Sequence, residues 1–308
     1  MNRRKCLALL GAGVIAGVNS AVYLSQSTQM EKMPKSPNEF RAVFHIHSNF
    51  SGDSYLQDCT IERYIDKAFE EELDLLVITD NSEDRSLDYL LSISSNSHFK
   101  VHSLGENAIV VDRGDKQLYF LRGIEYHNHS ENLGGHLLAL GHTKKILNEA
   151  KYTVNDMIKI IHDHSGLTIP PHPFAVEVLG VNMGGMGLKL MDIKDEVDAV
   201  EVFNAQNICL IPGIIDATQF NYKAKIFADK HHLARICGVD CHRVKDLGVC
   251  YMKFPRDKIN LNDGEKLVGS LKKLITETKN PEVYRQYAFE RYNSWLGFVE
   301  YQLNARIS

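Results

Sequence analysis

The sequence of 308 residues predicts an α/β fold built around a parallel sheet. Two observations support this prediction. Short apolar runs alternate along the chain with segments of helical periodicity, which is the order expected of β-α-β units. Most of these runs lack a strict in–out alternation, as expected of strands buried on both faces of a parallel sheet. The composition, 44% hydrophobic and 24% charged, is typical of a globular protein.

Seven segments are predicted as strands because they are apolar runs bounded by turn-forming residues. They cover residues 42–47, 73–79, 118–125, 136–141, 167–171, 199–203 and 234–239. An additional run, 108–111, is expected to pair with 118–121 as a hairpin across the turn sequence DRGDK.

Helices are predicted between and after these strands from apolar residues at helical spacing. Thr60 is a suitable N-cap for the first helix, and Thr153 with Asp156 has the spacing of a capping box before the second. The expected helices cover residues 60–73, 153–166, 215–231, 263–279 and 281–304. The Gly- and Met-rich segment 181–192 is expected to be a mobile loop near the functional site.

The first 24 residues differ from the rest and predict an export signal or an N-terminal anchor. A basic start, MNRRK, precedes an apolar run, and the pair Arg3 and Arg4 resembles that of a twin-arginine signal. A polar leader follows over residues 25–40, and residues 41–308 are expected to form a single domain. We therefore expect an exported, extracytoplasmic protein, cleaved or tethered, that contacts the membrane only through its N-terminal segment.

The balance of charge disfavours binding to long nucleic acids. The chain has a net charge of −4, and removal of its first 20 residues changes this to −7, because they carry three basic residues and no acidic one. Proteins that hold nucleic acids by their phosphates normally have a basic surface. We therefore expect a small-molecule substrate and no extended nucleic-acid binding.

The segment VFHIHSNFSGDS has the residue types of a metal site. His45 and His47 are two apart on a predicted strand and therefore share a face, and Asp53 follows in the next turn. Paired imidazoles with a carboxylate suit a divalent ion, although two solvent-facing histidines on an edge strand would look the same. Other predicted strands also end in polar residues, and active sites of α/β proteins form at the carboxyl ends of strands.

Six motifs, in order, extend this observation. HIHSNFSGDS, VITDN, GIEY, GGHLLALG, PPHPF and GVDCH resemble those of the polymerase and histidinol phosphatase (PHP) domain superfamily, over about residues 41–252. The resemblance implies a distorted (β/α)7 TIM-like barrel with two or three metal ions at the strand ends. It also implies the hydrolysis of phosphoesters, although a few members cleave other bonds.

The resemblance also implies a ligand set, with Glu125 as the carboxylate that bridges two metals. Asn81 is a departure, because the family usually has a histidine there and an amide oxygen is a weaker ligand. One of the ions is therefore expected to be bound loosely, hydrated or absent. The positions that match the family's ligands are His45, His47, Asp53, Glu125, His136, His172, Asp240 and His242, with Asn81 at the ninth.

These residues predict a metal-dependent hydrolase, most simply of a small phosphoester. The ions, Zn, Mn or Fe, would polarise a phosphoryl oxygen and supply a metal-bound hydroxide as nucleophile. His242 or Asp80 could protonate the leaving group, and Arg243 could hold a substrate phosphate. Asp80 could equally orient a ligand histidine. A metallohydrolase of an amide or other ester, or a non-catalytic metal-binding module, remains an alternative.

Two other residues near these motifs are expected to have lesser roles. His127 is expected to face solvent or substrate, with metal binding as the minor alternative, and Glu201 in an apolar strand is expected to give structural support.

Overall fold

The structure is a computed structural model that describes residues 34–52, 56–93, 98–127, 134–143, 145–146, 151–178, 181–207, 210–211, 215–216 and 218–277. The predicted export signal or anchor, most of the polar leader, Asp53 and the predicted helix 281–304 lie outside these residues. Among the helices described, none has both the length and the apolar character needed to cross a membrane.

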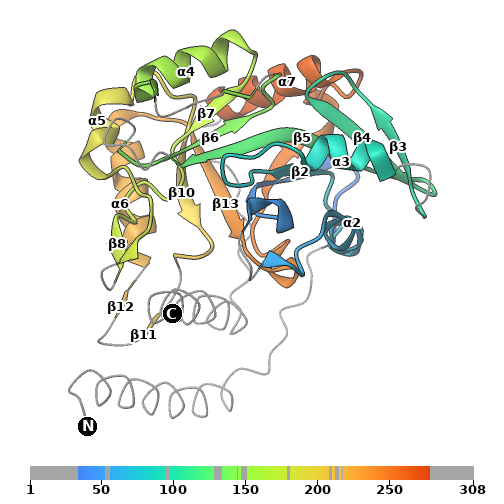
Figure 1. The fold of residues 1–308 in the computed structure, drawn as a ribbon, viewed down its shortest axis with the longest axis horizontal. Coiled ribbons are helices and arrows are strands. Elements are labelled where there is room, and N and C mark those ends of the chain that lie inside the picture. Colours follow the sequence, from blue (N-terminus) through green and yellow to red (C-terminus); the bar gives the residue numbers. More distant parts are fainter. Residues whose placement is uncertain are drawn as a thin grey trace.

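A mixed sheet of ten strands forms the centre of the fold (Figure 1). Five neighbouring strands run parallel, which confirms the predicted α/β class. In spatial order these are β10 (Val200–Asn204), β13 (Arg235–Cys241), β1 (Glu39–Ile46), β2 (Leu75–Ile78) and β5 (Lys116–His127).

Antiparallel strands extend this parallel group, so the sheet is mixed. β4 (Ala108–Arg113) pairs with the first half of β5, β6 (His136–Leu140) with its second half, and β14 (Met252–Pro255) with the start of β1. The connection from β5 to β6 is too short to hold a crossover helix, so the chain must reverse direction there. The remaining strands are β3 (Lys100–Ser103) beside β4 and β7 (Leu167–Ile169) beside β6.

The predicted hairpin is confirmed in its register. Ala108 lies opposite Leu121 and Val111 opposite Leu118. The residues from Ala108 to Val111 are all buried, so both faces of this part of β4 are covered.

In the described part of the chain, six α-helices connect and cover these strands (Figure 1). The Thr60 side chain caps α2, and Thr153 and Asp156 form the predicted capping box of α4. Two of the helices, α3 and α5, are not among those predicted. The helices are α2 (Ile61–Glu70), α3 (Ser86–Ile93), α4 (Val154–Asp163), α5 (Leu190–Ile193), α6 (Thr218–His231) and α7 (Gly264–Glu277).

Two predicted segments differ from the structure. Helix α6 begins at Thr218 rather than at residue 215, because β12 (Ile215–Asp216) pairs with β11 (Leu210–Ile211), and the intervening Pro-Gly sequence favours a turn. The segment 181–192 is not one loop: it contains β9 (Val181–Asn182), which pairs with β8 (Glu177–Val178), then a 3-10 turn (Gly187–Lys189) and the start of α5.

Candidate metal centre

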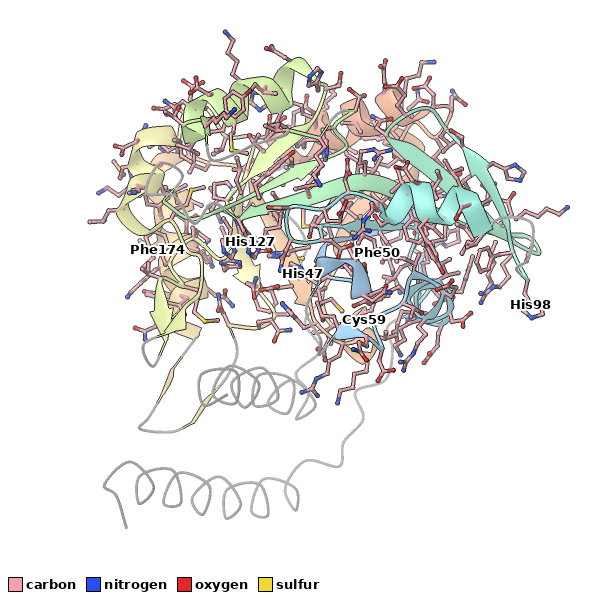
Figure 2. The ribbon with its side chains drawn as sticks, viewed as in Figure 1. His47, Phe50, Cys59, His98, His127 and Phe174 are labelled. Atoms are coloured by element: carbon pink, nitrogen blue, oxygen red, sulfur yellow. The ribbon has the colours of Figure 1, made fainter. Side chains whose placement is uncertain are left out.

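The candidate site lies where the parallel strands end. His45 lies on β1 and His47 directly follows its last residue, Ile46, while β5 supplies Glu125 and β13 supplies Asp240. Because neighbouring parallel strands run in one direction, their carboxyl ends meet at one edge of the sheet. His136 is the first residue of β6, and since β6 runs antiparallel to β5, its amino end reaches the same edge. Figure 2 shows His47 and His127 close together there.

Four of the predicted ligands form a buried inner group. His45 Nε2 lies 3.4 Å from Glu125 Oε1 and 3.4 Å from Asp240 Oδ1. His47 Nε2 lies 3.3 Å from Glu125 Oε2 and 3.3 Å from the same Asp240 oxygen. These separations exceed those of ordinary N–H···O hydrogen bonds. They match the roughly 3.4 Å between two ligands that each lie about 2.1 Å from one tetrahedral ion.

An unpartnered atom supports the same interpretation. Within the described part of the chain, His45 Nε2 is buried without a hydrogen-bond partner, although two carboxylates face it. A buried polar atom without a partner is costly and needs an explanation. A divalent ion among these atoms provides one, so the residues present fit a metal.

Glu125 is the centre of a wider set of imidazoles. His136 Nδ1 lies 2.9 Å from Glu125 Oε1, and His172 Nε2 lies 3.3 Å from the same oxygen. His127 Nε2 lies 2.9 Å from Glu125 Oε2. One carboxylate thus has both oxygens among five imidazoles, those of His45, His47, His127, His136 and His172, which is an arrangement able to bridge two ions.

His242 and Arg243 follow β13. His242 Nδ1 lies 2.8 Å from the Asp240 backbone oxygen, and its ring centroid is 4.5 Å from that of His47. His47, Asp240 and His242 form one of four groups whose ligand atoms lie within 4.8 Å of one another. Arg243 is half-buried beside them.

Asp80 lies in a different position from the other candidates. Its carboxylate accepts hydrogen bonds from Ser48 N at 2.5 Å, Ser48 Oγ at 2.6 Å and Ser51 Oγ at 2.8 Å, and it is fully buried. Burial raises the pKa of Asp80 to about 6, against these hydrogen bonds. Ser51 Oγ also lies 3.3 Å from His47 Nδ1, so Asp80 is placed to orient His47 through Ser51 rather than to contact a substrate.

Asn81 follows β2 at the same edge. It forms an isolated parallel bridge with Glu125, and its backbone nitrogen donates to Ser51 Oγ at 3.2 Å. Its backbone therefore lies beside the backbone of Glu125.

Glu201 on β10 has a larger role than the sequence indicates. Its Oε1 lies 3.0 Å from His45 Nδ1, and its Oε2 accepts from His172 N at 2.7 Å and from Asn204 Nδ2 at 2.8 Å. A carboxylate at Nδ1 keeps the proton there and directs the Nε2 lone pair toward the site. Gly238 leaves room for this contact, since a Cβ there would collide with Glu201 Oε1. The feature of the sequence that could have indicated this role is an acidic residue, Glu201, in an otherwise apolar strand.

The charges of the site reinforce one another. Burial opposes ionisation of Glu125 and Asp240, but the surrounding histidines hold both carboxyl pKa values well below their ordinary range. Burial likewise opposes protonation of His45, yet the charges of Asp240, Glu201 and Glu125 raise its pKa well above 6.5. The result is a buried pair of anionic carboxylates that attracts cations.

Three of these residues have left-handed backbone conformations. The φ angles are 67° at His45, 29° at His172 and 51° at Asp240. Such angles are uncommon outside glycine and cost free energy, and they concentrate at functional sites. At His45 the pairing register of β1 also shifts. His45 and His47 therefore converge through a local irregularity, and not through the simple strand alternation that the sequence predicts.

Exposure increases from one side of the site to the other. The His45, His47 and Glu125 side chains are at most 2% exposed, whereas those of Asp240, His242, His127 and His136 are between 13% and 22% exposed. The site is therefore accessible to solvent at the last four residues.

Comparisons with known proteins concern one segment of the sequence and the fold. The PHP-associated family model, PHP_C, matches residues 218–274, from α6 to α7. No curated protein matches the sequence.

Three solved structures resemble the fold. PsfC from Pseudomonas syringae has a TM-score of 0.55 at 16% identity, covering 87% of this chain and 99% of its own. A two-domain protein from Bacteroides vulgatus that contains a predicted PHP-like metal-dependent phosphoesterase has a TM-score of 0.51 at 12% identity, covering 85% and 70%. Endonuclease Q from Pyrococcus furiosus has a TM-score of 0.51 at 13% identity, covering 80% and 57%.

At these identities the structural likeness concerns the fold. Together with the PHP-associated segment, it confirms that this chain resembles the PHP domain superfamily.

Proposed function

We propose that this protein is a metal-dependent hydrolase of a small phosphoester. The observation that carries the proposal is the position of Glu125, one buried carboxylate with both oxygens among imidazoles, beside a second carboxylate from Asp240. Two or three ions, of Zn, Mn or Fe, fit these nitrogen and oxygen donors.

The ions, when bound, would polarise a phosphoryl oxygen and lower the pKa of water. His45, His47, Glu125 and Asp240 would hold one of them. His242, partly exposed beside Asp240, would give a proton to the leaving oxygen.

Arg243, which directly follows His242 in the sequence, would bind a substrate phosphate. The family resemblance implies that Asp53 and Asn81 would complete the metal shell.

We also propose that the sheet closes into a distorted barrel between β7 and β10. No ladder joins these two strands among the described residues. Two backbone hydrogen bonds support closure, from Asp198 N to Thr168 O at 3.1 Å and from Glu201 N to Pro170 O at 3.3 Å.

A small substrate is favoured over a polynucleotide by the net charge of −4. Endonuclease Q, whose fold is similar, has been crystallised with a DNA duplex that carries an abasic lesion. Duplex and single-stranded DNA therefore belong in the substrate panel.

The proposal is tested with the full chain loaded with Mn, Zn or Fe and offered phosphomonoesters, phosphodiesters, DNA, amides and carboxylic esters. We expect turnover of a small phosphoester. His47→Ala should lower kcat/KM by more than about 100-fold, because loss of an outer-shell partner alone costs 10–100-fold.

The matched control is His102→Ala, which removes an exposed histidine that lies 3.1 Å from Asp112 on the far edge of the sheet. It should leave kcat/KM unchanged. If the protein hydrolysed amides and no phosphoester, the alternative, a metal-dependent amide hydrolase, would be correct. If the protein neither bound metal nor turned over any substrate, both hydrolase proposals would be rejected.

A further inference from the structure

We propose that His127 is a metal ligand, and that with Glu125 and His136 it forms a second cation site at the open side of the centre. The inference rests on the proposed metal-dependent function and deepens it, because neither the sequence motifs nor the family resemblance assigns His127 to the metal. We refer to these three residues as the outer site.

The backbone brings the three side chains together. Glu125 and His127 are two apart at the end of β5, so both project from the same face of the strand. His136 is the residue directly opposite His127 in the antiparallel pair of β5 and β6. Cross-strand partners of this kind have adjacent side chains, and the ligand atoms of the three residues all lie within 4.8 Å of one another.

The ring orientations direct both imidazoles at one carboxylate. The rings of His127 and His136 are stacked, with centroids 3.9 Å apart and planes 16° from parallel. His127 Nε2 is 2.9 Å from Glu125 Oε2, and His136 Nδ1 is 2.9 Å from Glu125 Oε1. Both contacts are hydrogen bonds to the carboxylate. A cation would take the place of their protons, since two ligands at right angles, each about 2.1 Å from an ion, lie roughly 3.0 Å apart.

Packing fixes the position of the His136 ring. Its backbone nitrogen donates to Gly184 O at 2.7 Å, and a Cβ on Gly184 would collide with the ring. A ligand that is held in place before the ion arrives loses less entropy on binding.

The inner group does not need His127. His45, His47, Glu125 and Asp240 already provide four donors for the inner ion, while the outer site has Glu125 as its only carboxylate. Without His127, the outer ion would keep just His136 and the shared Glu125 from this group. At 21% and 22% exposure, His127 and His136 also leave access for water or a substrate oxygen.

The test measures bound metal directly. The full-length wild type, His127→Ala and His127→Gln are equilibrated with Mn or Zn at defined free concentrations, and the bound ions per chain are determined by elemental analysis. We expect His127→Ala to weaken one class of bound ion by at least tenfold and to leave the inner class intact. His102→Ala, which removes a histidine beside a carboxylate elsewhere, should bind as the wild type does.

The outcomes separate the two proposals. Wild-type protein that binds no metal would reject the proposed function. Wild-type protein that binds two ions, together with unchanged binding in both His127 variants, would reject the role of His127 and leave the proposed function standing. Thermal unfolding in the presence of a chelator shows whether each variant folds. If His127→Ala does not fold and His127→Gln does, the comparison with the wild type is made with His127→Gln.

Discussion

At the scale of single residues, Glu201 determines which nitrogen of His45 faces the metal. Its Oε2 already accepts two N–H groups, from His172 and Asn204. In Glu201→Gln the amide oxygen must stay with those donors, so the amide NH2 faces His45 Nδ1 and moves the proton to Nε2. We expect metal affinity to fall about 10–100-fold, as for other outer-shell changes, and bound metal by titration checks this.

Asp198→Asn is the matched control, because it alters a second, partly buried carboxylate–histidine pair outside the proposed ligands. Asp198 Oδ2 is 2.8 Å from His162 Nε2 and accepts from Thr168 N at 2.8 Å. This variant should lose stability and keep its metal. Equal metal affinity in Glu201→Gln and the wild type would contradict the tautomer argument.

At the scale of elements, the segment after β9 holds the start of β6 in place. Gly184 has a φ angle of 76° and lies against the His136 ring. Gly184→Ala adds both backbone strain, about 1 kcal/mol, and a collision that displaces the ring. We expect weaker binding of one class of ion, measured by elemental analysis after dialysis.

Gly114→Ala separates these two effects. Gly114, in the turn between β4 and β5, has a φ angle of 63° and open space around its Cβ position. Gly114→Ala should lower the free energy of unfolding through strain by an amount similar to that in Gly184→Ala. It should bind metal as the wild type does. If both variants lose metal, strain rather than the collision is the cause.

At the scale of the whole molecule, stability depends on pH through buried neutral histidines. Burial, with a smaller effect from the Arg122 charge and from His164, lowers the pKa of His142 from 6.5 to about 3. Within the described residues, neither ring nitrogen of His142 makes a hydrogen bond of normal geometry. The unfolded chain therefore takes up a proton as the pH falls through 6.5, and the folded protein does so only near 3.

Because the folded pKa is the lower one, this residue makes the protein less stable as the pH falls between 6.5 and about 3. The expected slope is about 1.4 kcal/mol per pH unit. In His142→Leu this slope should disappear from the free energy of unfolding, measured with denaturant at several pH values in the presence of a chelator. Parallel curves for variant and wild type would show that His142 does not remain neutral.

Much of the fold could be predicted because it depends on local pattern. The apolar runs predict the strands that contribute to the site, and the hairpin register follows from the turn between its strands. The direction of β6 could have been predicted from its short connection to β5. The start of α6 could not be placed as well, since the pairing of β11 with β12 competes there with helical periodicity.

The site was predictable in part for the same reason. His45, His47, Glu125 and Asp240 are near strand ends, and the ends of parallel strands meet whatever the details of packing. His127 was expected to face solvent or substrate, because its approach to His136 requires the register of an antiparallel pair that the sequence does not reveal. Asp80 reaches His47 only through Ser51, a contact that depends on the local turn.

The sequence by itself determined the kind of donor available, imidazole and carboxylate, and the edge of the sheet at which these donors gather. Only the tertiary structure decided which atoms face one another: Glu201 lies 156 residues from His45 in the chain, yet it holds the ring of that histidine. The physical reason is that periodicity encodes which face of an element is buried. Contacts between distant residues depend instead on strand register and on backbone angles such as those at His45 and Asp240, which are stable only inside the assembled fold.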